Sequence, residues 1–370
     1  MIKGVKTEKK LNHKAIDKLY KQGALYAKHG EYTRMTHDID VCKVPMNAEF
    51  TCPNWDGRLS SEGCVFCPNF ARQFTYESFR DVIGASIKEQ VKDQVEYYRN
   101  KGAGQKFWVY IAFGTNTYAP VPDLKKIFDE TLDHPDVIGL AIGTRPDCLP
   151  DEVLDLLGSY VKQGYEIWLE VGSQTMHYHT SERVNRQHGV AESMRVVQEA
   201  HKRGIFVTFF LIMGMPNETR NEMIETARII SALGVDALKI YPCLVMQDTR
   251  LLQQYKSGKY RPLSKTEYVQ LMADFIEHLS PYVLVQRISK DCGLEGKVVP
   301  EWNTHRFVIG PEVEKILAIR GTRQGAKYKL GLTAEELTPL EMMDKKESIK
   351  KIHRPKDKTK ANCPEKQDLF

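Results

Sequence analysis

The chain has 370 residues, of which 42% are hydrophobic and 27% are charged, and its formal net charge is +5 at pH 7. These fractions are those of a soluble globular protein that forms one large domain or two ordinary ones and buries a full core. They exclude an integral membrane protein, because no apolar run approaches the roughly 18 to 20 residues that a spanning helix requires.

The distribution of charge and cysteine adds two expectations. Residues 1–6 have neither the apolar core nor the cleavage site of a secretory signal, and the cysteines are scattered, so we expect a cytoplasmic protein. Residues 1–21 hold seven lysines against two acids, and residues 344–370 hold nine lysines or arginines against five acids. Basic ends favour contact with a polyanion such as RNA, although lysine-rich tails are more often simply solvated.

The N-terminal part is predicted to be helical. Residues 11–29 carry apolar side chains at the spacing of one amphipathic helix that ends at Gly30, so residues 1–30 are expected to form a basic helical extension. A candidate strand covers residues 34–44. A second helix is predicted over 76–100, where a glycine-containing run ends it.

After residue 105 the chain alternates between apolar strands and helical segments. Strands are predicted at 106–113, 137–142, 166–172, 205–214 and 237–242, with helices at 122–132, 150–163, 190–203 and 217–233. This alternation indicates parallel β/α units, and the polar turn after each strand places the chemistry at the C-terminal rim of a barrel-like sheet. With the strand at 34–44 the count is six, and no G-x-G-x-x-G follows any strand. We therefore predict an α/β protein with a partial (β/α)6 barrel over 31–245, rather than a doubly wound open sheet.

Beyond residue 245 the alternation loosens into an α+β C-terminal extension over 246–343 that completes the core. Helices are predicted at 264–280 and 311–320, and a further strand at 283–288. The last segment, 344–370, is lysine-rich and lacks periodic apolar residues, so it is predicted to be a basic disordered tail.

Three cysteines stand close together just after the first predicted strand. Cys64 and Cys67 have the two-residue spacing that turns both sulfurs toward one ion or cluster, and Cys52 is returned to them by a loop rich in turn-forming residues. Three thiolates leave a fourth coordination position open, as a catalytic site needs and a structural zinc site normally lacks. From spacing alone, zinc closed by His37 or Cys42, an iron–sulfur cluster and a redox pair all remain possible.

Further motifs follow the cysteine loop in a fixed order. They are TNTYAP at 115–120, GTRPDCL at 143–149, EVGSQ at 170–174, NRQH at 185–188, MGMPNET at 213–219 and RGTRQG at 320–325. Together with CPN at 52–54 and GCVFC at 63–67, they make the chain resemble a radical S-adenosylmethionine enzyme over about residues 30–330. It is most similar to the YhcC/YtqA-like family, relatives of the Elongator catalytic subunit.

The resemblance implies a radical chemistry that explains the open position. Cys52, Cys64 and Cys67 would hold three irons of a [4Fe–4S] cluster, and S-adenosylmethionine would bind the fourth. One electron then cleaves the S–C5′ bond of this cofactor, and the resulting 5′-deoxyadenosyl radical abstracts a hydrogen atom from the substrate. The resemblance favours the iron–sulfur interpretation of the cysteines over zinc.

The resemblance also implies contacts with S-adenosylmethionine. The expected residues are Phe66 on the adenine side, Asn116 and Thr117 at the methionyl amino group, Thr144, Arg145 and Arg186 at the carboxylate or ribose, and Glu170 at the ribose, with Gln174 in the same motif.

Each of these residues has an ordinary structural alternative. Phe66 could be core, Asn116 and Thr144 turn residues, and the two arginines salt-bridge partners. Glu170 is harder to explain in this way, because a buried carboxylate needs a partner. Three further cysteines match no second cluster motif and are expected to be buried or incidental thiols: Cys148, Cys243 and Cys292.

Departures from the related enzymes narrow the expected function. We see neither an acetyltransferase-like domain after the barrel nor a second three-cysteine site, which argues against the Elongator catalytic subunit and against methylthiolation of tRNA. The resemblance to the YtqA-like branch implies action on tRNA, in which the C5 side chain of the wobble uridine changes from carboxymethylaminomethyl to aminomethyl. The expected partners are tRNA and an electron donor such as flavodoxin or ferredoxin, with no DNA and no membrane.

A segment of mixed basic and aromatic residues fits this substrate. Four basic residues are interleaved with two tyrosines, a combination that suits a single-stranded RNA loop, although any one of them is more often part of a plain solvated surface: Tyr255, Lys256, Lys259, Tyr260, Arg261 and Lys265. Two alternatives remain, a radical enzyme that acts on a small metabolite or peptide, and a zinc-stabilised RNA-binding adapter without chemistry.

Overall fold

The computed structural model describes residues 10–68, 85–112, 114–289, 296–302 and 306–331. The chain divides into two compact units, Met1–Tyr328 and Lys329–Phe370, and all described helices and strands lie in the first. The predicted tail at 344–370 and Cys292 lie outside the described residues, and the predicted domain boundaries stay predictions.

In the described part of the chain, seven parallel strands form one sheet in the order β1-β2-β3-β4-β5-β6-β8. They are β1 (Val41–Met46), β2 (Lys106–Ile111), β3 (Val137–Thr144), β4 (Glu166–Gln174), β5 (Phe206–Met213), β6 (Ala237–Pro242) and β8 (Leu284–Arg287). Sequence order equals spatial order, as successive right-handed β/α units require. The predicted partial barrel is confirmed, with β8 as an additional strand where a strand was expected at 283–288.

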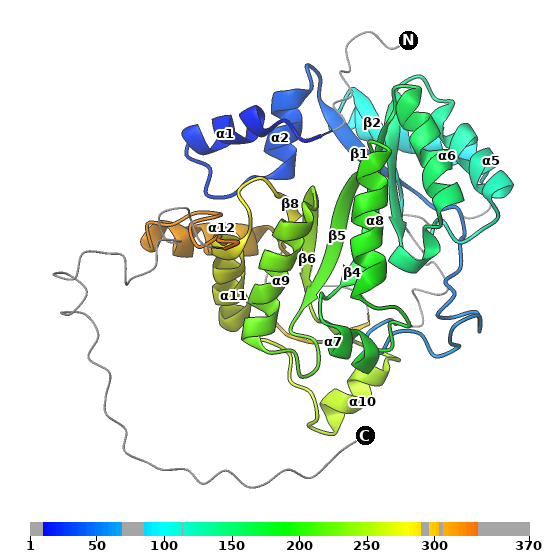
Figure 1. Ribbon diagram of the computed structural model, residues 1–370. Coiled ribbons are helices and arrows are strands. Elements are labelled where there is room, and N and C mark those ends of the chain that lie inside the picture. The colour runs from blue at the N-terminus through cyan, green and yellow to red at the C-terminus, as the bar shows by residue number, and fades with distance from the viewer. Residues whose placement is uncertain (1–9, 69–84, 113, 290–295, 303–305, 332–370) are drawn as a thin grey trace, which may run out of the picture. The chain divides into compact units, whose positions relative to one another are not determined.

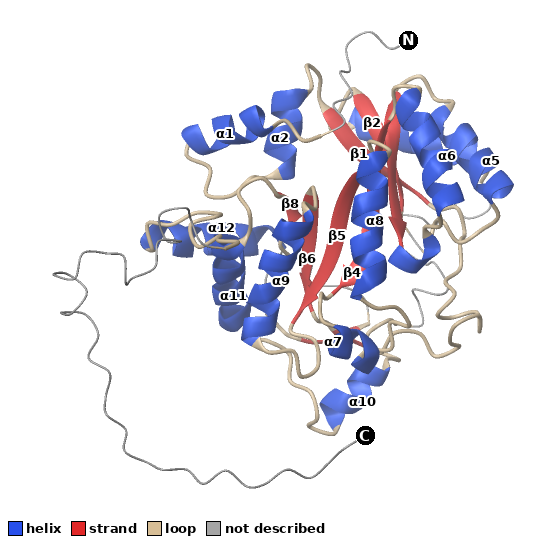
Figure 2. Ribbon diagram, viewed as in Figure 1, coloured by secondary structure: helices blue, strands red, loops and turns tan. Residues whose placement is uncertain are grey.

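One face of the sheet is covered by helices (Figures 1 and 2). They are α4 (Ile87–Asn100), α5 (Val121–Leu132), α6 (Asp151–Lys162), α8 (Val190–Lys202), α9 (Arg220–Leu233) and α11 (Lys265–His278). Local capping sets several of their ends: Ser86 and Thr219 each form a capping box with the glutamate three residues on, and Gly234 closes α9 in the left-handed conformation.

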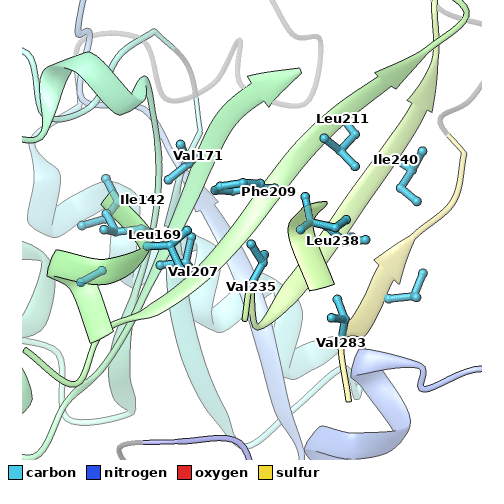
Figure 3. Packing of buried hydrophobic residues seen from close by; sticks show 14 of the residues in the cluster. Ile142, Leu169, Val171, Val207, Phe209, Leu211, Val235, Leu238, Ile240 and Val283 are labelled. Atoms are coloured by element: carbon cyan, nitrogen blue, oxygen red, sulfur yellow. The ribbon is translucent and has the colours of Figure 1, made fainter. Parts of the chain in front are cut away.

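The core between the sheet and these helices is built from alternate strand residues (Figure 3). Leu169, Val171, Val207, Phe209 and Leu238 are completely buried there. Because side chains alternate across a strand, the residues between them point to the other face. That other face lines the interior of the barrel, so the same strands that build the core also position the site.

The N-terminal extension differs from the prediction of one helix over 11–29. The structure has α1 (His13–Lys21), a turn, and α2 (His29–Thr36). Because α2 includes the first residues of the strand predicted at 34–44, β1 begins later than predicted, at Val41, and ends at Met46. The helix stops because Gly23 adopts a φ of +93°, which only glycine takes readily. The apolar face of α1 packs against Trp108, Trp168 and Phe206 near the beginnings of the strands. The extension therefore closes the barrel at its amino-terminal end (Figure 1).

The remaining elements are short or lie at the ends of the strands. They are the 3-10 turn η2 (Pro146–Cys148), α7 (Tyr178–Arg183), α10 (Arg250–Lys256), α12 (Arg306–Ile319), and the antiparallel pair β7 (Val245–Met246) and β9 (Lys297–Val299). Among the described residues, no helix is both long and apolar enough to cross a membrane.

Candidate active site

A cavity of about 960 Å³ occupies the interior of the barrel. Residues from all seven strands of the sheet line it, and Cys52, Cys64 and Cys67 line it too. The cysteine loop follows β1, so it lies at the carboxyl ends of the strands, which form the mouth of the barrel. Catalytic groups of barrel enzymes gather at this rim.

The loop brings the three predicted cysteines to one wall. Two turns fold it back, since the backbone N–H of Trp55 donates to the Cys52 carbonyl at 2.8 Å and that of Leu59 donates to the Pro53 carbonyl at 2.8 Å. Cys52 and Cys64 are buried and Cys67 is half-buried. Within the described residues, no three His, Cys, Asp or Glu side chains converge on one point, as a single bound metal ion would require.

Two asparagines hold this loop, and the only signal of them in the sequence was their place in the motifs at 52–54 and 185–188. Asn54 is completely buried, and its amide donates to the Asn185 carbonyl at 2.7 Å and to the Cys64 sulfur at 3.4 Å. Asn185 donates in turn to the Gly63 carbonyl at 2.6 Å and adopts a φ of +58°. These bonds fix the Cys64 end of the loop to the turn that follows α7.

Arg186 and Arg145 stand beside the thiols, both 5% exposed or less. Arg186 Nη1 donates to the Cys64 sulfur at 3.2 Å, and Arg145 forms two hydrogen bonds to Asp147 at 2.8 and 2.9 Å. Burial opposes the charge on Arg145, but Asp147 and the thiols of Cys52 and Cys64 outweigh it, so the pKa of Arg145 is raised. The pair supplies positive charge where thiolates would gather.

Asn116 and Thr117 have structural partners and do not line the cavity. The Asn116 amide donates to the carbonyls of Ile111 and Gly143 at 3.0 and 2.6 Å, which joins the ends of β2 and β3. The Thr117 hydroxyl bonds Thr144 at 2.6 Å and the Cys148 carbonyl at 2.5 Å. Their contact with the methionyl amino group therefore stays a prediction.

The other predicted cofactor-binding residues do line the cavity: Phe66, Thr144, Arg145, Glu170, Gln174 and Arg186. Phe66 also packs against the cluster of buried residues around Val65. A Cβ at Gly172 would stand 3.0 Å from the Gln174 amide nitrogen and 3.5 Å from Arg186 Nη2, so a larger residue there would crowd both side chains. Cys148 and Cys243 are buried, as expected. The role of each residue toward a cofactor stays a prediction.

Glu170 has partners that the sequence did not reveal. Its carboxylate is completely buried between Lys43 Nζ, at 2.6 Å, and Lys239 Nζ. Burial alone would raise the pKa of Glu170, but Lys239 and Lys43 outweigh it and lower the pKa to about 2. The only sequence signal was a single lysine in each of two apolar strands, where a buried charge must be paired.

The wall at the mouth fits an iron–sulfur cluster and a zwitterionic cofactor. Three thiols are available, two arginines balance negative charge, and three buried polar atoms lack a hydrogen-bond partner: Asn54 Oδ1, Arg145 Nη1 and Arg186 Nε. A buried polar group without a partner in the protein indicates a place for a ligand.

Comparison with known proteins identifies the family. The chain matches the model of the Radical SAM superfamily over residues 60–230 and that of the Radical_SAM C-terminal domain over 235–318. It is 44% identical over 316 residues to an uncharacterized protein of Methanocaldococcus jannaschii, covering 85% of this chain and 96% of that protein. The chain belongs to the radical SAM superfamily. Within it, the relatives include YtqA of Bacillus subtilis, 35% identical over 290 residues, 78% of this chain and 88% of that protein.

More distant radical SAM relatives share part of the chain or the fold. A stretch of 167 residues is 29% identical to the tRNA uridine(34) acetyltransferase of Methanocaldococcus jannaschii and covers 44% of this chain and 30% of that protein. The structure of Elp3 from Methanocaldococcus infernus superimposes with a TM-score of 0.58 and 20% identity, covering 77% of this chain and 64% of that one. The latter likeness shows that the two chains share the fold.

The protein is therefore a radical SAM enzyme, and its cofactors are a [4Fe–4S] cluster and S-adenosylmethionine. The adapter without chemistry is accordingly wrong. Cys52, Cys64 and Cys67 would hold the cluster, which with S-adenosylmethionine supplies a 5′-deoxyadenosyl radical when bound. The N–H groups of Asn54 and Arg186 orient the Cys64 sulfur, and hydrogen bonds to cluster sulfurs help to set the reduction potential.

Proposed function

We propose that this radical SAM enzyme modifies tRNA by converting the carboxymethylaminomethyl group at C5 of the wobble uridine to aminomethyl. The proposal depends on one observation. A stretch that makes up 44% of the chain is similar in sequence to a protein named for its action on uridine 34 of tRNA. A cavity of about 960 Å³ gives room for a nucleobase with an extended side chain beside the cofactor.

The chemistry of the proposed reaction balances. Removal of a hydrogen atom from the methylene carbon between nitrogen and carboxylate, followed by loss of one electron and one proton, leaves an imine. Water cleaves the imine to the aminomethyl group and glyoxylate. In the whole reaction S-adenosylmethionine would take up both electrons and one of the two protons and be converted to methionine and 5′-deoxyadenosine, while the other proton passes to water.

The surface beside the mouth supports an RNA partner. Helix α10 contacts the cysteine loop, since the backbone N–H of Leu251 donates to the Val65 carbonyl at 2.9 Å and Arg250 donates to the Gly63 carbonyl at 2.6 Å. Lys256 and Lys259 are exposed on this segment and are free to meet phosphate groups.

The neighbouring residues of the predicted RNA-binding segment are less available. Arg261 and Lys265 are paired with Glu267 and Glu312. Tyr260 is 7% exposed and donates to the Gly214 carbonyl at 2.7 Å, so its ring is not available for stacking on a base. The proposed RNA contact therefore depends on the two exposed lysines.

The test begins with anaerobic purification of the full chain and assays of iron, sulfide and the visible spectrum. We expect about four irons per chain and, after reduction by a flavodoxin or ferredoxin, formation of 5′-deoxyadenosine from S-adenosylmethionine. Nucleoside mass spectrometry of tRNA incubated with the enzyme should then show the aminomethyl product. Cofactor cleavage without any change in tRNA, and no salt-sensitive tRNA binding, would favour a small metabolite or peptide instead.

A further inference from the structure

Below the mouth, the cavity continues into a polar compartment that the cysteines do not reach, which we name the inner chamber. It is formed around Glu170 by side chains of β1, β2, β6 and β8: Lys43, Tyr110, Lys239, Gln286 and Arg287. Beneath it lies the amino-terminal end of the barrel, which we call the barrel floor and which is formed by the cluster of α1 with Trp108, Trp168 and Phe206.

The inner chamber holds more positive than negative charge. Among the described residues that form the inner chamber, Glu170 is the one carboxylate. Lys43 and Lys239 both contact it. Arg287 lines the same space, contacts the Tyr241 hydroxyl at 3.4 Å, and has no carboxylate within ion-pair distance among the described residues. The chamber therefore holds three cationic side chains and one negative group, which contacts two of them.

The burial of Lys239 and the nearby cations both work against its charged form. Its ammonium group lies between two rings, 4.4 Å from the Tyr110 centroid and 4.9 Å from that of Phe210. Burial lowers its pKa to about 7, with Lys43 and Arg287 adding to the effect and Glu170 opposing it. An anion placed here would relieve the repulsion among the cations.

A second, independent observation also points to a ligand. His29 of α2 is 7% exposed and lines the cavity, and its Nε2 atom has no hydrogen-bond partner. Burial, and then Lys43, lower the pKa of His29, so the ring is neutral, and its tautomer decides whether Nε2 donates or accepts a hydrogen bond. The N-terminal extension thus places a polar atom without a hydrogen-bond partner, His29 Nε2, in the same cavity.

We propose that the inner chamber binds the carboxylate of the substrate's reacting side chain, with Lys239 and Arg287 as its principal cationic contacts. The assignment of this carboxylate to a modified uridine rests on the proposed function, but the preference for an anion does not. Arg145 and Arg186 stand next to the thiols at the mouth, so the carboxylate of S-adenosylmethionine has its own cationic partners there. A carboxylate in the inner chamber would point the adjacent methylene carbon back toward the mouth.

A small probe tests the chamber without RNA. N-acetylglycine presents a carboxylate on a short chain, and N-acetylglycinamide has the same shape without the charge. Binding of each to the unreduced holoenzyme is measured by calorimetry with S-adenosylmethionine saturating. Because hydrogen bonds to charged groups are the stronger ones, we expect roughly tenfold or greater preference for the acid.

Variants of the chamber residues test whether the preference for N-acetylglycine over N-acetylglycinamide arises in the inner chamber. Arg287→Gln leaves the contacts of Glu170 intact and should fold normally, while Lys239→Gln removes one of them. Both should lower the preference for the acid to about one. Lys162→Gln, at the end of α6 on the outer surface, removes the same charge and should change nothing.

Three results would overturn the proposal: equal affinity for acid and amide, a preference that both chamber variants retain, or loss of N-acetylglycine binding when S-adenosylmethionine is added. The last would assign the chamber to the cofactor's own carboxylate. If tRNA is modified but the chamber variants leave its KM unchanged, the chamber is wrong and the proposed function stands. If the probe binds as expected but tRNA is untouched, the anion site stands and the tRNA assignment is wrong.

Discussion

The two ends of the barrel treat buried polar groups differently. At the mouth, Arg145 and Arg186 are 3% and 5% exposed, yet each keeps a nitrogen without a hydrogen-bond partner. At the amino-terminal end, Glu166 is 8% exposed and both its oxygens are engaged, by Trp108 Nε1 and His37 Nε2, each at 3.0 Å. Two exceptions there among the described residues are Trp168 Nε1, whose ring faces Lys43 of the inner chamber, and His29 Nε2, which lines the same cavity.

The difference indicates that polar residues at the mouth serve ligand binding, whereas those at the amino-terminal end of the same sheet serve stability. An unsatisfied buried polar group costs roughly 1–3 kcal/mol, so it persists where a ligand satisfies it. The mouth carries such groups and the floor is mainly packed, as expected when loops at the carboxyl ends of strands carry the chemistry. Changes at the two ends should therefore have separable effects.

Cys64→Ala should have the largest effect on function, with little effect on stability. Losing one of three thiols should reduce iron from about four atoms per chain to below one and abolish 5′-deoxyadenosine formation, with little change in the far-ultraviolet circular dichroism. Cys42→Ala is the matched control, because Cys42 also lines the cavity but lies on β1 outside the loop. Loss of iron in the control as well would mean that the ligand set is larger than the loop.

At the other end, Ile16→Ala should cost stability and leave the site intact. Ile16 is completely buried in the cluster that closes the barrel floor, so its truncation should lower the free energy of unfolding by roughly 2–5 kcal/mol. Urea denaturation measures the loss, and iron content of the folded variant should be unchanged. Ile319→Ala, at a residue that is 76% exposed, provides a control with almost no effect. An iron-free but fully stable Ile16 variant would contradict the separation of the two ends.

Asn54→Ala probes a group that links the loop to the rest of the mouth. Removing the amide leaves the Asn185 carbonyl unpaired, which should cost roughly 1–3 kcal/mol and loosen the loop. We expect the reconstituted cluster to bleach faster in air than the native one, followed by absorbance in the visible range. Unchanged bleaching would show that the loop is held without this bond.

The smallest effect is a dependence of stability on pH at the floor. Burial opposes the charged form of His37, but its hydrogen bond with Glu166 and the charge of Glu166 outweigh it, and the pKa of His37 is raised above its usual value. The groups that face this ring are Glu166, the Thr33 carbonyl, Asp38 and the Trp108 ring.

A raised pKa in the folded state means that the stabilisation is fully present below the unfolded pKa and is lost as pH rises through the folded value. The native protein should therefore lose stability as pH rises above about 6.5, the usual pKa of histidine, measured by urea unfolding, and His37→Gln should lose less. If His37→Gln showed the same pH dependence of stability as the native chain, another titrating group would be responsible for the loss.

Local patterns predicted much of this molecule, and long-range partners explain what they missed. Strands β2 to β6 are buried on both faces, so continuous apolar runs marked them. The cysteine loop was visible because its three ligands lie within sixteen residues. In contrast, Lys43 and Lys239 pair with Glu170 across 127 and 69 residues of sequence, a distance that no local pattern reports.

The same reasoning explains two errors of detail. The helix predicted over 11–29 continued in apolar spacing through Leu25, but Leu25 belongs to the turn after α1, and the chain then pairs with β8 through Lys28 and Val285. Tyr260 looked like an exposed stacking residue because it stands among basic side chains, while its ring is buried against elements distant in sequence. In both cases tertiary packing overrode a correct local signal.

The closed floor has a consequence for biosynthesis. The backbone N–H of Ala27, between α1 and α2, donates to the side chain of Gln324, 297 residues later, and its carbonyl accepts from Val285. At roughly 5–20 residues per second, the ribosome needs about 15–60 s to make that intervening stretch. During this interval the backbone of Ala27 lacks its partner Gln324. The connection between α1 and α2, although translated early, therefore completes its native hydrogen bonds only when the end of the described chain has been made.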